Sequence, residues 1–175
     1  MKRITAIVSV LLLAGCQGQQ ERLKADIERV GGTVEFDDHK PAKPMIAVDL
    51  HGIVDADKLL ARLEGQTQLR RLDLGGADVS DENLAPLRGM TELEELNLSA
   101  TQIGDEGLQH LAGLAHLREL GLGGTRVTDA GLPHLHRMKG LERMNLAGTK
   151  VTEAGIKELR EALPRVAIQT LPPKD

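Results

Sequence analysis

Apolar residues recur along this 175-residue chain with a period of 24 positions, and this period organises most of the sequence. A triplet of leucine-type residues with the spacing L-x-x-L-x-L begins at Leu69, Leu93, Leu117 and Leu141, and a degenerate copy begins at Met45. Apolar and polar positions alternate within each triplet, which predicts a short β-strand with one buried face. A period of this length is typical of a stacked array with one supersecondary unit in each repeat.

A second block after each triplet predicts a short helix. Its apolar residues stand three positions apart, as in Leu84, Leu87 and Met90, and this is helical spacing. The predicted helix starts, each followed by an acid, are Ser80, Thr128 and Thr152. The column of acids at this place is Asp81, Asp105, Asp129 and Glu153. We interpret the column as helix-start chemistry, because an acid in the first turn suits the helix dipole.

The repeat resembles the leucine-rich repeat family, whose pattern is L-x-x-L-x-L-x-x-N/C-x-L. Threonine takes the Asn/Cys place at Thr101, Thr125 and Thr149, and Ala77 takes it in the first clear repeat. The resemblance covers residues 45–168, and the helical block looks like the bacterial subset of the family. It implies an α/β fold, a short right-handed solenoid arc with a parallel sheet on the concave side and short helices on the convex side. It also implies that each threonine side chain bonds the backbone of the loop leaving the strand.

The expected repeats are 45–68 (degenerate), 69–92, 93–116, 117–140 and 141–168, the last including a C-terminal cap. Val54 falls one position before its column, which predicts a local slip in the degenerate repeat. Residues 169–175 are expected to form a frayed tail.

Residues 20–44 predict an N-terminal cap, because the first repeat of a solenoid exposes an apolar face that needs covering. An amphipathic helix would carry Leu23, Ile27 and Val30 on one side and stop at a glycine pair. An edge strand would follow, with Val34 and Phe36 pointing inward.

The first sixteen residues have the layout of a secretory signal, with Lys2 and Arg3 before an uncharged run over residues 4–14. That run is too short to span a bilayer. Leu13, Ala14, Gly15 and Cys16 resemble the lipobox of bacterial lipoproteins. The resemblance implies removal of residues 1–15, acylation of Cys16 with chains such as palmitate, and a short tether over residues 16–19. An ordinary signal peptide with an incidental cysteine is the alternative.

The lipobox resemblance places the protein on the bacterial cell envelope, anchored to a membrane by its lipid. Gln17 after the cysteine favours the outer membrane, facing the periplasm, if the cell is Gram-negative. Cys16 is also the only cysteine, so no disulfide forms within the chain.

Composition limits the partners. Removal of Lys2 and Arg3 leaves 20 basic and 26 acidic residues, a net charge of −6 with His neutral, and the chain has one Phe and no Trp or Tyr. Nucleic-acid binders need a basic stripe and often stacking aromatics, so no nucleic-acid partner is expected. The commonest aromatic anchors of protein interfaces are missing too. An interface would have to be polar or rely on Arg, Met and Leu.

The solvent-facing strand positions are the candidate concave binding face, and they comprise Arg71, Asp73, Glu95, Asn97, Glu119, Arg143 and Asn145. Five strands at about 4.8 Å and five residues at about 3.3 Å give roughly 400 Å². A standard interface buries about 800 Å² per partner, so loops or caps would have to contribute. The alternative is a solvated face on which the mixed charges neutralise one another.

Enzymatic signals are few. His110 and His134 share a column and His136 follows, but no Cys, Asp or Glu stands beside them in a ligand-like spacing. No nucleophile motif, P-loop or HExxH is present, so we expect no enzyme, no metal and no cofactor.

Three hypotheses follow from the sequence. The first is a lipid-anchored envelope module that binds another envelope protein, which the sequence does not identify. The second is a structural or self-associating envelope lipoprotein without a specific ligand. The third is metal binding or hydrolysis through the histidine column. The sequence does not indicate an oligomeric state.

Overall fold

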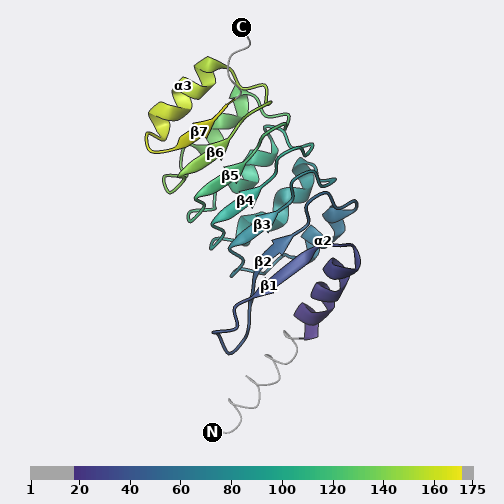
Figure 1. Ribbon diagram of the computed structural model, residues 1–175. Helices are drawn as coiled ribbons and strands as arrows, with labels where there is room; N and C mark the ends of the chain where they lie inside the picture. Colours follow the sequence, from purple (N-terminus) through teal and green to yellow (C-terminus); the bar gives the residue numbers. More distant parts are fainter. Residues whose placement is uncertain (1–17, 171–175) are drawn as a thin grey trace.

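The computed structural model describes residues 18–170, which form one sheet with helices along one side (Figure 1). The sheet has seven strands in the order of the chain: β1 (Thr33–Phe36), β2 (Met45–Asp49), β3 (Arg71–Asp73), β4 (Glu95–Asn97), β5 (Glu119–Gly121), β6 (Arg143–Asn145) and β7 (Ala167–Gln169). β1 is antiparallel to β2, and all later pairs are parallel.

Residues that stand one sequence period apart pair with each other in the register of the sheet. Leu72 pairs with Leu96, Leu96 with Leu120, and Leu120 with Met144, so the paired residues stand one period apart. These four side chains are buried, and their strand neighbours in the sequence face the opposite side. The predicted parallel sheet is therefore confirmed, with one apolar column per leucine position.

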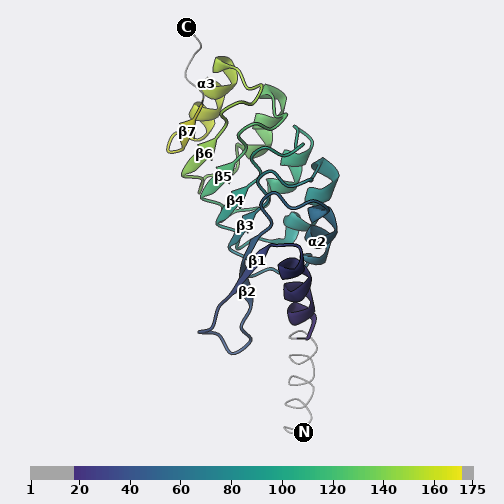
Figure 2. The same cartoon turned by 45° about the vertical axis from the view of Figure 1, so that its right-hand side comes forward.

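Short helices cover the other side of the sheet (Figure 2). They are α2 (Ala56–Arg62), the 3-10 helices η1 (Asp81–Gly89), η2 (Gly107–Leu111) and η3 (Asp129–Leu135), and α3 (Glu153–Ala162). The three central helices are 3-10 helices, and the buried leucines of each stand three positions apart, a spacing that three residues per turn places on one side of the helix. Ser80, Thr128 and Thr152 are the N-cap residues, as predicted.

The chain before the repeats contains the predicted helix and edge strand. Residues 18–29 are helical, and the chain leaves the helix at Gly31, where φ is +96°. Leu23 and Ile27 are buried, but Val30 is 44% exposed, because the helix ends before it. Val34 and Phe36 of β1 are partly buried against the core.

The threonine column stabilises the loops that leave the strands. The hydroxyls of Thr101 and Thr125 each donate to the carbonyl three residues earlier at 2.6 Å, and that of Thr149 does so at 2.7 Å. This is the backbone bond that the family resemblance implied. Ala77 is buried at the same place and has no side-chain donor.

The acid column joins successive repeats. Asp105 accepts hydrogen bonds from Thr128 in the next repeat, from the backbone N–H at 2.8 Å and from the hydroxyl at 2.7 Å. Asp129 accepts the same pair from Thr152 at 2.8 and 2.6 Å. Our interpretation of these acids as helix-start chemistry was therefore incomplete, because their carboxylates bind the N-cap residue of the following repeat.

In the repeats after the first clear one, the glycine two residues after the acid makes room for the acid of the preceding repeat. A Cβ atom on Gly131 would lie 2.5 Å from Asp105 Oδ1, and one on Gly155 would lie 2.2 Å from Asp129 Oδ1. Asn83 stands at the glycine place in the first clear repeat, and its Oδ1 accepts the Ser80 N–H at 2.8 Å. An amide from the same repeat thus replaces the carboxylate of the preceding one.

The degenerate repeat contains a larger slip than the sequence predicted. The carbonyl of Ile53 accepts the N–H of Asp78, as the carbonyl of Val79 accepts the N–H of Gln102 one repeat later. Ile53 packs against the core, whereas Val54 is 74% exposed. Ile53, two positions before the periodic place, therefore fills the column that we had related to Val54. Asp55, two residues later, has a left-handed backbone with φ +61°, and the two-residue shift in register is accommodated at this point.

Candidate binding face

The concave side of the sheet forms one open groove that runs from β1 to β7, with a volume of about 1170 Å³. Its charged lining residues come from strands and from α3: Glu35, Asp49, Arg71, Asp73, Glu95, Glu119, Arg143 and Arg160. The structure therefore brings all seven sequence-predicted residues of the candidate binding face, Arg71, Asp73, Glu95, Asn97, Glu119, Arg143 and Asn145, to one surface.

The groove is longer across the strands and narrower along them than the concave face estimated from the sequence. Seven strands give six spacings, about 29 Å, but the regular strands have three residues each, about 10 Å. The product, roughly 300 Å², is still well below the 800 Å² that a standard interface buries per partner. A partner of ordinary size would therefore need the loops at the strand ends as well.

The first charged column contains Arg71, Glu95, Glu119 and Arg143, which lie beside one another in the register of the sheet. Arg71 pairs with Glu35 of β1, and Arg143 pairs with Glu119. Glu95 has no ion pair within residues 18–170. The arginines of this column are thus neutralised, whereas one carboxylate at its centre is not.

The second column, Asp73, Asn97 and Asn145, has a structural role at the strand ends. Each side chain accepts the backbone N–H two residues later, at 2.7, 3.0 and 2.9 Å respectively. Asn97 also donates to Asp73 at 3.0 Å. These side chains are half-buried, so they shape the groove and expose only part of their polar surface.

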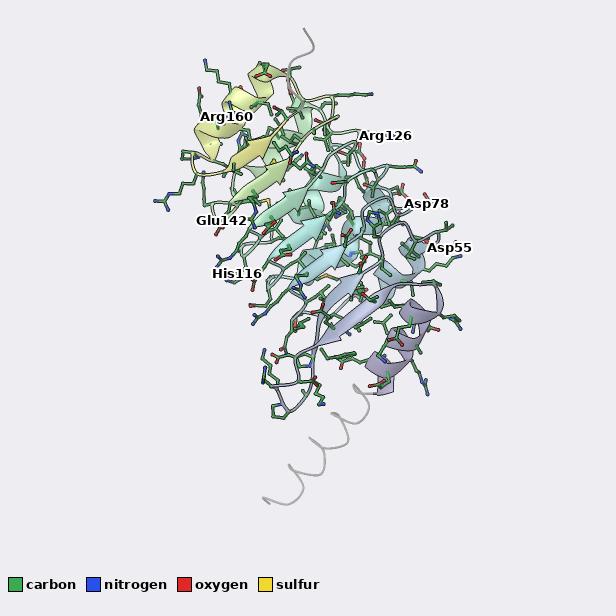
Figure 3. All side chains as sticks on the ribbon, viewed as in Figure 1. Asp55, Asp78, His116, Arg126, Glu142 and Arg160 are labelled. Atoms are coloured by element: carbon green, nitrogen blue, oxygen red, sulfur yellow. The ribbon has the colours of Figure 1, made fainter. Side chains whose placement is uncertain are left out.

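A third column stands at the start of the strands and also consists of opposite charges. Arg118 pairs with Glu142 at 3.1 Å, and Arg70 approaches Glu94 at 3.8 Å. Figure 3 places Glu142 and His116 on this side of the molecule. Mutual neutralisation, the alternative that the sequence left open, accounts for most of the charge here.

The histidine column lies on the helical side. His110 belongs to η2 and His134 to η3, and His136 directly follows η3. Burial lowers the pKa of His110, and the nearby Arg88 lowers it further while Asp81 opposes the change. No group of three or more His, Cys, Asp or Glu side chains within residues 18–170 is arranged to hold a metal ion.

The sequence matches the Leucine Rich repeat family over residues 90–112. Among solved structures, the chain is similar to the ectodomain of the Arabidopsis thaliana receptor kinase GASSHO1/SCHENGEN3, with 19% identity and a TM-score of 0.56 over 78% of this chain and 16% of that one. That ectodomain was solved in complex with CASPARIAN STRIP INTEGRITY FACTOR 2. The fold is a leucine-rich repeat solenoid.

Two further structures are similar to this solenoid. Leiomodin-1 actin-binding site 2 has 13% identity and a TM-score of 0.52, over 66% of this chain and 78% of that one. An internalin from Listeria monocytogenes has 19% identity and a TM-score of 0.49, over 72% of this chain and 41% of that one. The solenoid spans less than half of the internalin and of the plant ectodomain. Comparison with curated proteins gives no match.

Leucine-rich repeat domains commonly mediate protein–protein interaction and are typically binding scaffolds without enzymatic activity; no catalytic family matches this solenoid. The predicted lipid attachment at Cys16 and the lipobox residues Leu13, Ala14 and Gly15 lie outside the described residues. Among residues 18–170, no helix is both long and apolar enough to cross a membrane.

Proposed function

We propose that this protein is a lipid-anchored module of the bacterial cell envelope that binds another envelope protein through its concave groove. The observation that carries the proposal is the open groove of about 1170 Å³, lined from β1 to β7 by polar strand positions. The lipobox pattern at Leu13–Cys16 supports the anchor. Two acyl chains hold a protein stably at a membrane, where one chain binds it only marginally.

Capture of partners from solubilised membranes tests the groove. In the double variant Glu119→Arg/Arg143→Glu, the two charges exchange places, so their ion pair is retained while the charge pattern in the groove is reversed. The matched control, Lys24→Glu/Glu28→Lys, exchanges a pair on the N-terminal helix, outside the groove. We expect wild type and control to enrich the same defined partner, and the groove variant to lose it. Equal enrichment by all three, or none above background, would contradict the proposal.

The substitution Cys16→Ser tests the anchor separately. It should abolish acylation and move the protein from the membrane fraction to the soluble fraction. Retention of the variant on membranes would refute the lipobox interpretation, and it would leave the groove experiment unaffected.

A structural or self-associating role is the second candidate, and the paired charges Arg143–Glu119 and Arg118–Glu142 favour it, because they satisfy one another across the strands. Light scattering on the Cys16→Ser protein tests the self-associating form of this role. A concentration-dependent rise in mass would support it, and a strict monomer at high concentration would remove it.

A further inference from the structure

The charge of the repeat array changes sign along its length. Residues 45–104 contain five Lys or Arg and eleven Asp or Glu, a net charge of −6, whereas residues 105–170 contain nine and eight, a net charge of +1. In Figure 3, Asp55 and Asp78 lie in the acidic half, and Arg126 and Arg160 lie in the other half. A partner that enters the groove therefore meets a negative field at the end nearer β2.

Of the four groove carboxylates on β1 to β4, three have no Lys or Arg partner in the part of the chain that the structure describes. Arg71 is the only Lys or Arg among the groove-lining residues of β1 to β4, and it pairs with Glu35. Among residues 18–170, Asp49 and Glu95 have no ion pair, and Asp73 has only the imidazole of His51 at 3.6 Å. At the other end of the groove, by contrast, Glu119 is paired with Arg143.

Two of these carboxylates are held in place by the backbone. Asp49 Oδ1 accepts the His51 N–H at 2.8 Å, and Asp73 Oδ1 accepts the Gly75 N–H at 2.7 Å. Within the described residues, Oδ2 of each makes no hydrogen bond. Each carboxylate therefore keeps one acceptor oxygen for a ligand, and binding needs little further ordering of the side chain.

The spacing of the acids sets the form of the occupant. Asp49 and Asp73 are partners in the register of β2 and β3, and Glu95 lies on β4. Strands lie about 4.8 Å apart, so Asp49 and Glu95 are separated by roughly 10 Å across the sheet. Glu95 also stands two residues, about 7 Å, before Asn97, the register partner of Asp73, so the two carboxylates are roughly 12 Å apart. Three to four residues of an extended chain that crosses the strands obliquely cover this distance, at about 3.3 Å per residue. Cations at every third residue of such a chain would reach both ends of the acidic set.

We propose that the part of the groove formed by β2, β3 and β4 binds an extended segment of the partner protein that carries Lys or Arg at about every third residue. This inference rests on the proposed function, because it assigns a chemistry to the partner that the groove binds. Charge complementarity carries it, since the groove offers no aromatic surface to hold an apolar segment. Arg is the better match, because it can bind the carboxylate of Glu95 through two parallel hydrogen bonds.

Calorimetry with a synthetic probe tests this inference on the full-length protein in detergent. The probe is a short glycine–serine peptide with arginine at every third position, and the same peptide with glutamine in place of arginine is its control. The variant Asp49→Asn/Glu95→Gln removes two groove charges, and its Asn side chain can still accept the His51 N–H. The control Glu82→Gln/Glu106→Gln changes the net charge equally at exposed residues outside the groove.

We expect the arginine peptide to bind the wild type and the control variant equally, and to bind the groove variant about tenfold more weakly, as for two exposed ion pairs. Added salt should weaken binding to the wild type. Equal weakening in both variants would reduce the effect to net charge and overturn the proposal, as would absence of binding to the wild type. If the peptide does not bind while membrane capture still depends on Glu119 and Arg143, the proposed function stands and only the cationic partner is refuted.

Discussion

The repeat at residues 69–92 and the repeats after it have the same strands and register, but their helix starts are held from different directions. In the later repeats, a carboxylate from the preceding repeat accepts the N–H at this place: Asp81 accepts that of Gly104, and Asp105 and Asp129 accept those of the N-cap residues Thr128 and Thr152. In the earlier repeat, Asn83 accepts the Ser80 N–H from within the same repeat. The acceptor for the N–H at the helix start can thus come from the preceding repeat or from the same repeat. A glycine at the place of Asn83 is found in the repeats where the preceding repeat supplies the acceptor.

The largest loss of stability should come from a side chain that fills the space at the glycine, where the carboxylate of the preceding repeat lies. Gly131→Ala would place Cβ 2.5 Å from Asp105 Oδ1 and 3.0 Å from Leu108, and Gly131 itself is buried. Overpacking of this kind costs about 1–3 kcal/mol, and we expect about 3 kcal/mol here because the carboxylate must also leave its partners. Urea unfolding measures the loss.

Gly113→Ala is the matched control, since its Cβ would come no nearer than 3.7 Å to any other residue. We expect it to change stability by less than about 0.5 kcal/mol. The double variant Asp105→Ala/Gly131→Ala should lose less than the sum of the two single variants, because the clash needs both groups. Additive losses would show that the glycine and the acid act independently.

The next largest loss of stability should distinguish the repeats whose acid bonds the following repeat from the degenerate repeat, whose acid does not. Asp105→Ala removes two hydrogen bonds from Thr128 and should destabilise the protein by about 2 kcal/mol. Asp57→Ala changes the acid two periods earlier, whose carboxylate has no hydrogen bond within the described residues. Only its favourable place in the first turn of α2 is lost, about 0.5 kcal/mol. Equal losses on thermal unfolding would remove the distinction between the repeats.

The sequence predicted the regular features because each column of residues depends on one local rule. The strand positions recur in register in four clear copies and the helix starts in three. The three threonine bonds were implied by the family resemblance. The acid contact escaped prediction because it joins residues 23 positions apart, across two repeats, and local rules assign both ends to helix starts. The acid followed two residues later by glycine, which recurs in three successive blocks, was the available signal.

The candidate binding face was predicted in outline, but its side chains do not all have the role expected. Alternation along the strands correctly brought Asp73, Asn97 and Asn145 to the groove. Sequence alone could not separate ligand contact from the backbone hydrogen bonds that these side chains make two residues further on. The unneutralised set Asp49, Asp73 and Glu95 emerged only when the partners of each arginine were known.

Low pH should affect the two kinds of helix start differently, because the Asp129 carboxylate titrates and the Asn83 amide does not. Hydrogen bonds from the hydroxyl and the N–H of Thr152 hold the pKa of Asp129 below its ordinary value of 3.8. The contact therefore contributes its full stability above the unfolded pKa, and this contribution is lost as pH falls through the folded pKa, below 3.8. The amide proton shift of Thr152 should titrate in that range, while that of Ser80, bound to the Asn83 amide, should not follow it.

Asp129→Asn is the control for this titration, since it keeps an acceptor and removes the ionisable group. In that variant the Thr152 amide shift should be flat between pH 5 and the acid transition of the fold. A Ser80 amide that titrates together with Thr152 in the wild type would mean that both report global unfolding and would remove the distinction.

The smallest effect concerns the left-handed residue in each exit turn, where one repeat differs from the rest. Gly52, Gly76, Gly124 and Gly148 have φ between +66° and +74°, and Ala100 takes the same place with φ +57°. A left-handed conformation costs a residue with Cβ about 1–2 kcal/mol relative to glycine. Glycine also makes the unfolded chain more flexible, which lowers the free energy of unfolding and offsets up to about 1 kcal/mol of the advantage of glycine in the turn. Ala100→Gly should therefore stabilise the protein by about 0.5 kcal/mol, and Gly124→Ala should destabilise it by about as much. Nothing nearer than 3.7 Å would contact the new Cβ of Gly124→Ala, so the backbone angle alone would be responsible. A pair of thermal melts that move in the same direction would show that the turn around Ala100 is not equivalent to the others.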